Sequence, residues 1–502
     1  MIDALIIGAG PTGLTLACEL IKRGLSVRIV EQLSSPTDQS RALALHSRTL
    51  EIFEKMGLIE IFLKRGQIVR RFKAHLNYAP LFEAEFCELD TPYPFVLIVP
   101  QADTERILAE HFIQLGGKVE RGISLQSLQG NLATLLHANG SEEKVAAKWI
   151  FGCDGAHSAV RRALSLPFTG AQFPETFALA DVEVESPLPN DQFQVYFHPQ
   201  GIGAFVPLPN PHHYRIIALL PEKIEKSSIH MDIAFFQHLL ETYSKLGIKI
   251  KRADWMSLFT IHRRITPKMR VGNVFLLGDA AHIHSPIGGQ GLNTSVQDAF
   301  NLAWKIGLVH QRLGKEILLD SYEAERYPVA KSVLRNTTLG TQLASSRFSR
   351  RFIMPLVGIL MRNTRIRKKL LRGVSELNIA YPNSPIIGWG HGCKGPKSGE
   401  RAPDAVLTNN VRLFSLLCHP LHTLICFGKE ELTPLLHAVK ASYSQTVHPI
   451  CISPEEAGEA VKIYSLEFPC FYLIRPDGVI AYSFRSLDPR PFLSYLDGIF
   501  KL

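Results

Sequence analysis

The sequence lacks several features that would point to a membrane, metal or disulfide-linked protein. Its eight cysteines form no CxxC pair and no metal-ligand spacing, which predicts free thiols and no metal site. No apolar run approaches the roughly 20 residues needed to cross a bilayer. Residues 1–8 lack the basic leader and the apolar length of a signal peptide. We therefore expect a cytoplasmic protein without a transmembrane segment.

Internal repeats and low-complexity tracts are also missing from the 502 residues. Apolar residues make up 46% and charged residues 20%, which is typical of globular proteins and makes extensive disorder unlikely. This length exceeds what one hydrophobic core usually supports. The chain is therefore expected to fold into two or three domains.

The net charge of +9 is concentrated in one segment, because residues 347–372 hold nine basic side chains and no acidic one. Apolar residues are interleaved with these charges, so the segment could be an amphipathic helix lying on anionic lipid. We prefer the alternative in which its apolar stripe packs on the protein while the charges face water. Nucleic acid is not expected as a partner, because no recognised binding module is present.

The chain begins with the pattern of a strand, a helix and a second strand. The apolar run at residues 4–8 ends in the glycine-rich sequence GAGPTG at residues 8–13, a helical pattern follows, and Glu31 closes the second strand. Glycines at these positions permit a tight turn, a close approach of pyrophosphate to the backbone, and close helix packing. Glu31 would accept hydrogen bonds from ribose hydroxyls, so this unit predicts a bound dinucleotide.

Two later motifs also follow buried strands. The sequence GCDGAHSAVR occupies residues 152–161 and leads into a helix. The sequence GDAAH occupies residues 278–282, and Pro286, a GGQGLN run at residues 288–293 and Asp298 lie downstream. The backbone N–H groups at the start of the helix near residue 291 would stabilise an anionic group of a ligand.

Together these three motifs resemble the flavoprotein aromatic hydroxylases, the family of para-hydroxybenzoate hydroxylase, phenol hydroxylase and the polyketide hydroxylases. The resemblance covers about residues 1–340. It implies that Asp279 binds the ribityl chain of FAD, that Asp154 and Arg161 serve both FAD and the pyridine nucleotide, and that Arg41 and Gln101 approach FAD. The expected cofactor-binding residues are Gly8, Gly10, Pro11, Thr12, Gly13, Glu31, Gln32, Arg41, Gln101, Asp154, Gly155, Arg161, Gly278, Asp279, Gly289, Gly291, Leu292 and Asn293.

The resemblance also implies a reaction. NADPH or NADH would reduce FAD, O₂ would add to give a C4a-hydroperoxide, and its distal oxygen would hydroxylate an aromatic, phenol-like substrate. No second dinucleotide fingerprint is present, so the nicotinamide is expected to dock transiently. Two alternatives stay open: a flavin oxidoreductase acting on a quinone, a polyketide or a membrane lipid, and a non-catalytic FAD-binding scaffold.

The substrate-side residues are harder to identify. By resemblance Pro286 faces the reactive flavin edge in a positional role, while His46, Tyr196 and His198 are candidates for contact with the substrate. Phenol hydroxylase has an aspartate where this chain has residues 43–44, Leu-Ala, which puts simple phenol in doubt as substrate. Arg48 and Glu51 are interpreted as an exposed i,i+3 pair on a helix.

The predicted fold is α/β (α+β), with a Rossmann-like FAD-binding domain, an inserted antiparallel-sheet substrate domain and a C-terminal thioredoxin-like α/β domain. The FAD-binding domain is expected in residues 1–75, 100–180 and 262–345, and the substrate domain in residues 76–99 and 181–261. A basic helical connector would occupy residues 346–398. The thioredoxin-like domain would occupy residues 399–502 and serve structure or oligomerisation, with a homodimer as the expected form.

Overall fold

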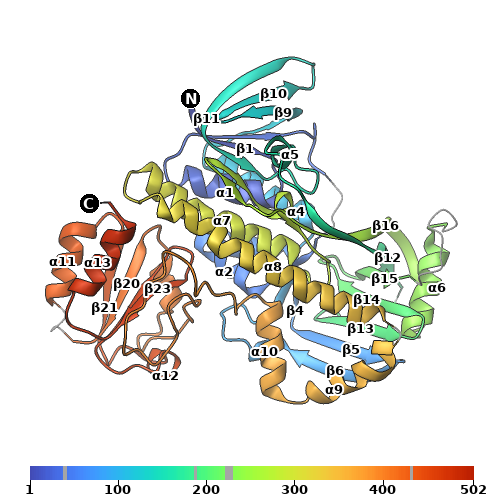
Figure 1. Ribbon diagram of the computed structural model, residues 1–502. Helices are drawn as coiled ribbons and strands as arrows, with labels where there is room; N and C mark the ends of the chain where they lie inside the picture. The colour runs from blue at the N-terminus through green and yellow to red at the C-terminus, as the bar shows by residue number, and fades with distance from the viewer. Residues whose placement is uncertain (38–41, 186–188, 221–229, 347, 430–432, 502) are drawn as a thin grey trace.

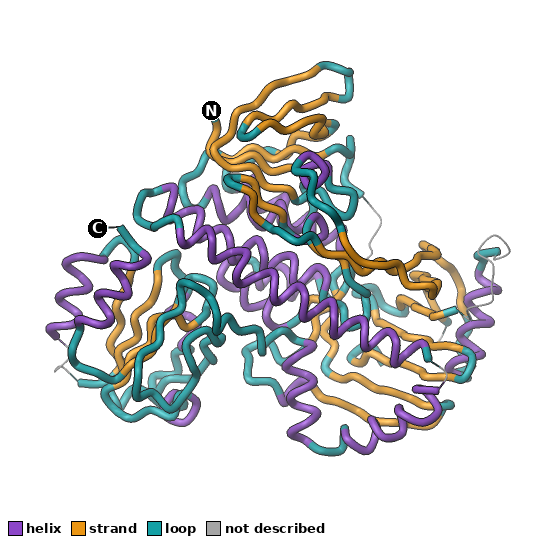
Figure 2. Tube along the Cα trace, in the orientation of Figure 1, coloured by secondary structure: helices purple, strands orange, loops and turns teal. Residues whose placement is uncertain are grey.

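The computed structural model describes residues 1–37, 42–185, 189–220, 230–346, 348–429 and 433–501 (Figure 1). Two eight-stranded sheets form the main body, and a four-stranded sheet with its helices lies to one side. A three-stranded sheet, β3-β7-β4, contributes side chains to the hydrophobic cores of both larger sheets. Its strands are β3 Ala44–Leu45, β7 Val96–Ile98 and β4 Gln67–Val69. Figure 2 shows how the helices and strands of the chain are distributed.

The first sheet is the predicted dinucleotide-binding sheet. Its spatial order is β17 Arg270–Val271, β18 Val274–Leu276, β11 Glu142–Gly152, β1 Ile2–Ile7, β2 Val27–Glu31 and β8 Val119–Arg121. All neighbours from β18 to β8 are parallel. The β9 strand Ile123–Gln129 and β10 Leu132–His137 extend β11 as antiparallel strands.

Helices cover the first sheet. The α1 helix, Pro11–Ile21, packs against α4, Gln101–Gln114, and against α7, Gly291–His310. Strands β1, β2 and β11 and helices α1 and α7 contribute to one continuous hydrophobic core, which explains their near-continuous apolar runs. Shorter helices follow the strand ends: α2 Ser47–Met56, α3 Ile59–Arg65 and α5 Ala159–Ala163.

The second sheet is the expected antiparallel sheet. Its order is β19 His282–Ile283, β16 Ile250–Ile265, β12 Thr169–Val184, β15 His213–Leu219, β14 Gly201–Pro207, β13 Gln192–His198, β5 Arg71–Leu76 and β6 Ala79–Glu85. Only the β13–β5 pair is parallel. The α6 helix, Ile233–Ser244, covers one face of this sheet.

One long helix follows α7 and packs beside it. The α8 helix runs through Ile317–Ser345 and contains Pro328. A proline removes one backbone hydrogen bond from a helix, but Val329 and Val333 remain packed in a buried cluster, so tertiary contacts carry the helix past it. A π-helical turn, α9 Met354–Leu360 and α10 Thr364–Val374 follow.

The last part of the chain forms its own sheet in the order β21 Val447–Ile452, β20 His422–Phe427, β22 Cys470–Ile474 and β23 Ile480–Phe484. Only β20 and β21 are parallel. Helices α11 Thr433–Tyr443, α12 Ala460–Ile463 and α13 Arg490–Ile499 accompany the sheet. A separate α/β unit is thus present, and its thioredoxin-like identity stays a prediction.

Candidate active site

The three glycine-containing motifs meet at one edge of the first sheet. Strands β1, β2, β11 and β18 are parallel neighbours, so their carboxyl ends share that edge. Gly8 follows β1, Glu31 ends β2, Asp154 follows β11, and Asp279 follows β18. Four segments that are far apart in the sequence therefore surround one place.

The glycines of the first motif meet different requirements. Gly8 has a φ of +102°, and a Cβ there would lie 2.4 Å from the carbonyl oxygen of Cys153. A Cβ at Gly13 would lie 2.0 Å from the carbonyl oxygen of Gly8. At Gly10, a Cβ would meet no atom of the described residues within 4 Å, its chain neighbours aside. This open space above the N-terminus of α1 fits a pyrophosphate group.

Two carboxylates lie beside this space. Glu31 accepts hydrogen bonds from the backbone N–H groups of Ala9 at 2.8 Å and Leu33 at 3.0 Å, so it is held against the glycine loop. Asp279 lies exposed in the 3₁₀ turn Gly278–Ala280. Carboxylates at the ends of β2 and β18 can accept the hydrogen bonds of ribose and ribityl hydroxyls, as FAD requires.

Three further residues are predicted beside the cofactor. Gln101 is the first residue of α4, and its Oε1 accepts a hydrogen bond from the backbone N–H of Ala42 at 3.3 Å. Gln32 is exposed after β2. Arg41 lies outside the described residues.

The loop that contains Asp154 and Gly155 is joined to the turn Gly278–Ala280 through Arg161. Asp154 Oδ2 accepts hydrogen bonds from the N–H groups of Ala159 at 2.6 Å and Val160 at 3.1 Å, which caps α5. The buried Arg161 guanidinium donates to the carbonyl of Ala280 at 2.7 Å, in the turn Gly278–Ala280. In the structure both residues brace the loops, while their contact with a nucleotide stays a prediction.

At the other end of the site, Asn293 connects two loops. Its Nδ2 donates to the carbonyls of Ala44 at 2.8 Å and Gly289 at 2.7 Å, and its Oδ1 accepts from the backbone N–H of His46 at 2.8 Å. His46 Nε2 lies 2.7 Å from the carbonyl oxygen of Gly288. Burial lowers the pKa of His46 to about 4, so the ring is neutral near pH 7 and donates this hydrogen bond.

The loop and the helix after it offer groups for an anionic ligand. Gly291 and Leu292 lie in the first turn of α7, where backbone N–H groups have no intrahelical partner. His284 packs against Gly291, since a Cβ there would lie 3.6 Å from the His284 ring. His284 Nε2 and His46 Nδ1 are buried without a partner among the described residues. Pro286 is exposed in the same loop. These residues fit the flavin end of FAD.

Comparison with known proteins now assigns the family. The FAD binding domain family matches residues 1–337. The 6-methylpretetramide 4-monooxygenase of Streptomyces rimosus is 35% identical over 411 residues, which are 79% of this chain and 73% of that relative. The chain belongs to the FAD-dependent aromatic monooxygenases.

Two further relatives extend the likeness over nearly the whole monooxygenase. The pentachlorophenol 4-monooxygenase of Sphingobium chlorophenolicum is 29% identical and covers 91% of this chain and 86% of its own. The solved structure of OxyS anhydrotetracycline hydroxylase from Streptomyces rimosus superposes with a TM-score of 0.79 at 29% identity, covering 99% of both chains. The predicted fold class, the FAD cofactor and the aromatic hydroxylase activity are confirmed, with NADPH or NADH as the cosubstrate typical of this family.

Asp298, which lies downstream of the GDAAH motif and had no role assigned from the sequence, supports the monooxygenase's turn Gly278–Ala280 from behind. Asp298 Oδ2 accepts from the backbone N–H of Gly278 at 3.1 Å and lies 2.8 Å from His282 Nε2. Asp298 Oδ1 accepts from Arg326 Nε at 2.7 Å. Arg326 comes from α8, where it carries no local signal. Glu376 is likewise buried beside α7, and Thr294 Oγ1 donates to it at 2.8 Å.

Tyr196 and His198 lie on the sheet face that is turned toward α6. Tyr196 is buried in the cluster that contains Phe236 of α6, and its hydroxyl donates to Gln194. His198 contacts Tyr78, whose hydroxyl bonds the backbone of α6 at Thr242. The structure therefore does not bring these two side chains to the flavin loops, although it does bring His46 there.

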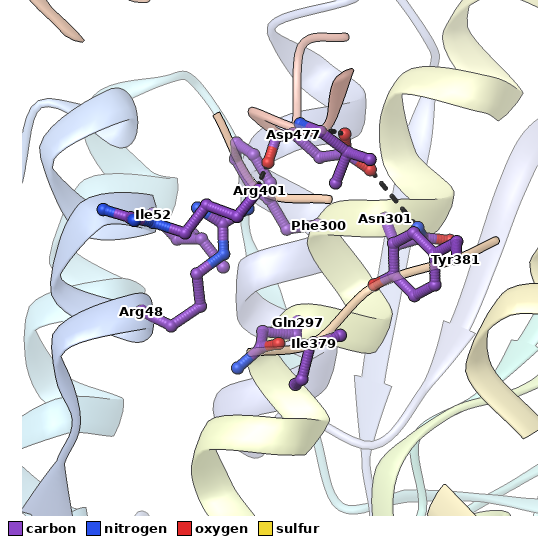
Figure 3. A pocket seen from close by; sticks show the side chains of 10 residues that line it. Arg48, Ile52, Gln297, Phe300, Asn301, Ile379, Tyr381, Arg401 and Asp477 are labelled. Atoms are coloured by element: carbon purple, nitrogen blue, oxygen red, sulfur yellow. Dashed lines mark hydrogen bonds between the residues drawn. The ribbon is translucent and has the colours of Figure 1, made fainter. Parts of the chain in front are cut away.

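The interpretation of Arg48 and Glu51 as an exposed pair was wrong. Both side chains are buried, because the last domain covers them. Glu51 also binds Arg401, and Arg48 donates to the carbonyl of Asp477. Figure 3 shows Arg48, Arg401 and Asp477 around a small pocket that is also lined by Ile52 of α2 and by Gln297 and Phe300 of α7.

Proposed function

We propose that this monooxygenase hydroxylates an extended aromatic ring system of the polyketide type in preference to a single phenol ring. The observation that carries the proposal is the apolar face of the second sheet beside β3. Phe193, Val206 and Ile217 share one hydrophobic cluster with Leu43 and Ala44, the residues just before His46.

This face is built to receive a ligand. On β13, Phe193, Val195 and Phe197 are all partly exposed, whereas Gln192, Gln194 and Tyr196 on the alternate face are buried. Partly exposed aromatic and aliphatic side chains can bury the apolar rings of a ligand against them. A ring system held against this wall would lie next to the loop that carries Pro286. Two relatives named for tetracyclic substrates support the same reading.

The residues divide the work as follows. Glu31 binds the adenosine ribose, Asp279 the ribityl chain, and the first turn of α7 the N1/O2 edge of the flavin. FAD supplies hydride acceptance from NADPH or NADH and the activation of O₂. His46, which is neutral and donates to the carbonyl of Gly288, holds the loop instead of acting as an acid. Pro286 positions the ring, and the apolar wall excludes water.

The domains follow from these roles. We assign FAD binding to the first sheet with α1, α4 and α7, and substrate binding to the second sheet with α6. The unit that begins near residue 399 packs on α7 and α8 through Trp304, Leu308 and Leu318. We assign it a structural role with the predicted thioredoxin-like fold.

The test compares single-ring phenols with fused-ring phenols as substrates of the FAD-loaded enzyme. Coupling is measured as ¹⁸O from ¹⁸O₂ in the product per NADPH consumed. We expect high coupling with fused rings only, and Phe193→Ala should lower kcat/KM about 10- to 100-fold because it removes buried contact. Tyr196→Phe, on the opposite face, is the control and should leave kcat/KM unchanged. Equal coupling with phenol, or a loss in the control alone, would refute the proposal.

A further inference from the structure

A stripe of apolar side chains is exposed where α8 ends and α9 and α10 begin. Leu339 and Leu343 on α8 continue, at helical spacing, into seven exposed side chains beyond it. The seven are Phe348, Phe352, Leu356, Ile359, Leu360, Ile366 and Leu370, and they are 41–65% exposed. Soluble surfaces rarely gather so many large apolar groups in one place, so the stripe is suited to an interaction. The expectation that the apolar residues of segment 347–372 pack on the protein is right for Val357, Met361 and Leu371 and wrong for these seven side chains.

The opposite sides of α9 and α10 are firmly packed. Val357, Met361 and Leu371 belong to the same hydrophobic cluster as Leu43. Arg367 is bonded to Glu88, and Arg372 to Asp90. Figure 1 places the two helices at the outer edge of the second sheet, beside β5 and β6. The exposed stripe is therefore the outer face of helices that are fixed in place.

Cationic side chains surround the stripe. Arg351, Arg362, Arg365, Lys368 and Lys369 are exposed, and no ion pair joins them to a carboxylate among the described residues. The sequence has no acidic residue between Glu325 and Glu376. A partner must then be apolar within and negatively charged at its surface.

We propose that the described residues 339–346 and 348–370 dock this enzyme on the surface of an anionic lipid bilayer. Aliphatic and aromatic side chains enter the boundary between headgroups and acyl chains, and the five cations contact the anionic headgroups. A second copy of the chain fits poorly, because a symmetric contact through this face would bring the same cations together. No helix in the described ranges is long and apolar enough to span a membrane, so the docking is peripheral.

Vesicle sedimentation of the FAD-loaded enzyme tests the proposal. Vesicles of phosphatidylcholine alone are compared with vesicles that contain about one third phosphatidylglycerol, at low and high salt. We expect sedimentation with the anionic vesicles only, and weaker binding at high salt. Lys368→Glu/Lys369→Glu should weaken binding by more than about 25-fold, at about fivefold per charge removed. Phe352→Ser/Leu356→Ser should weaken it by about tenfold or more.

The matched control is Lys64→Glu/Ile113→Ser, which changes an exposed cation and an exposed apolar residue on α3 and α4. It should bind like the parent enzyme, and all variants should keep their FAD content and NADPH oxidation rate. Absence of sedimentation at low salt, equal binding to both vesicle types, or binding that neither double variant weakens would overturn the proposal. The proposal would also be overturned if vesicle binding is absent and light scattering shows a concentration-dependent dimer that both the charge variant and the apolar variant abolish. Substrate turnover does not enter this readout, so its outcome is independent of the proposed substrate class.

Discussion

Replacing Glu51 with glutamine would test how the last domain is held on the FAD-binding body. The Glu51 carboxylate is buried between two guanidinium groups: Arg401 Nε and Arg48 Nη1 both donate to it at 2.9 Å. Thr91 Oγ1 donates at 2.8 Å. Burial by itself raises the pKa of Glu51, but the charges of Arg401 and Arg48 outweigh burial and hold the pKa below its usual value. The carboxylate is therefore ionised at neutral pH.

The expected loss can be estimated from this arrangement. Glutamine has nearly the same shape but no charge, so two buried cations lose their counter-charge. Breaking a buried ion pair by removing one partner costs about 3–5 kcal/mol. For a cooperative unit of 150–250 residues, this lowers the melting temperature by about 6–20 °C. Differential scanning calorimetry measures the shift, and proteolysis within residues 391–403 reports release of the last domain.

The control is Glu60→Gln, which removes an exposed carboxylate from α3. The parent enzyme should also lose stability as pH falls through the lowered pKa of Glu51, because a depressed carboxylate pKa stabilises the fold only above the unfolded value. Glu51→Gln should remove this part of the pH dependence. A melting temperature within about 2 °C of the Glu60→Gln control would refute the view that this buried ion pair holds the interface.

Three further perturbations follow from the site. Gly13→Ala should destabilise the apoprotein by about 1–3 kcal/mol and lower its melting temperature, because its Cβ would meet the carbonyl oxygen of Gly8. Gly10→Ala should leave the melting temperature unchanged but lower the affinity for FAD. A lower melting temperature for Gly10→Ala than for Gly13→Ala, with FAD affinity kept, would contradict the pyrophosphate assignment. Asn293→Ala should lower kcat by up to about 100-fold with FAD still bound, because three hydrogen bonds that align the flavin loops are lost. An unchanged kcat in stopped-flow assays would count against the role of Asn293 in aligning these loops. Burial raises the pKa of Glu376 to about 7. The contribution of this group to folding stability is therefore present below the unfolded pKa and is lost as pH rises through about 7, by up to about 3 kcal/mol. Glu376→Gln should make the melting temperature less dependent on pH between pH 5 and 8, and an unchanged pH dependence would exclude this group as its cause.

Local patterns predicted which segments meet at the carboxyl edge of the first sheet. A strand that ends in glycine, followed by a helix, has few alternatives, because only glycine tolerates the φ of Gly8 and the contact at Gly13. Parallel pairing then brings Glu31, Asp154 and Asp279 to one edge. Order and spacing along the chain were therefore sufficient to predict a dinucleotide and, with the resemblance, FAD.

The substrate half could not be predicted in the same way. Alternation along β13 separates Phe193 from Tyr196 but does not say which face turns toward the flavin loops, since that depends on the register and packing of the whole sheet. Similarly, the exposure of Leu356 and Leu360 depends on which side of α9 the second sheet occupies.

By itself, the sequence determined the strand–helix units, the glycine positions and the carboxylates at the strand ends, because these depend on backbone conformation and on neighbours within a few residues. Tertiary structure alone decided that Arg48 and Glu51 are buried, since the partner Arg401 lies 350 residues beyond Glu51 in the chain. It also decided that Asn293 fastens two loops and that an apolar stripe faces outward. The burial of a side chain and the identity of its hydrogen-bond partners depend on contacts between distant segments, which a local sequence pattern does not predict.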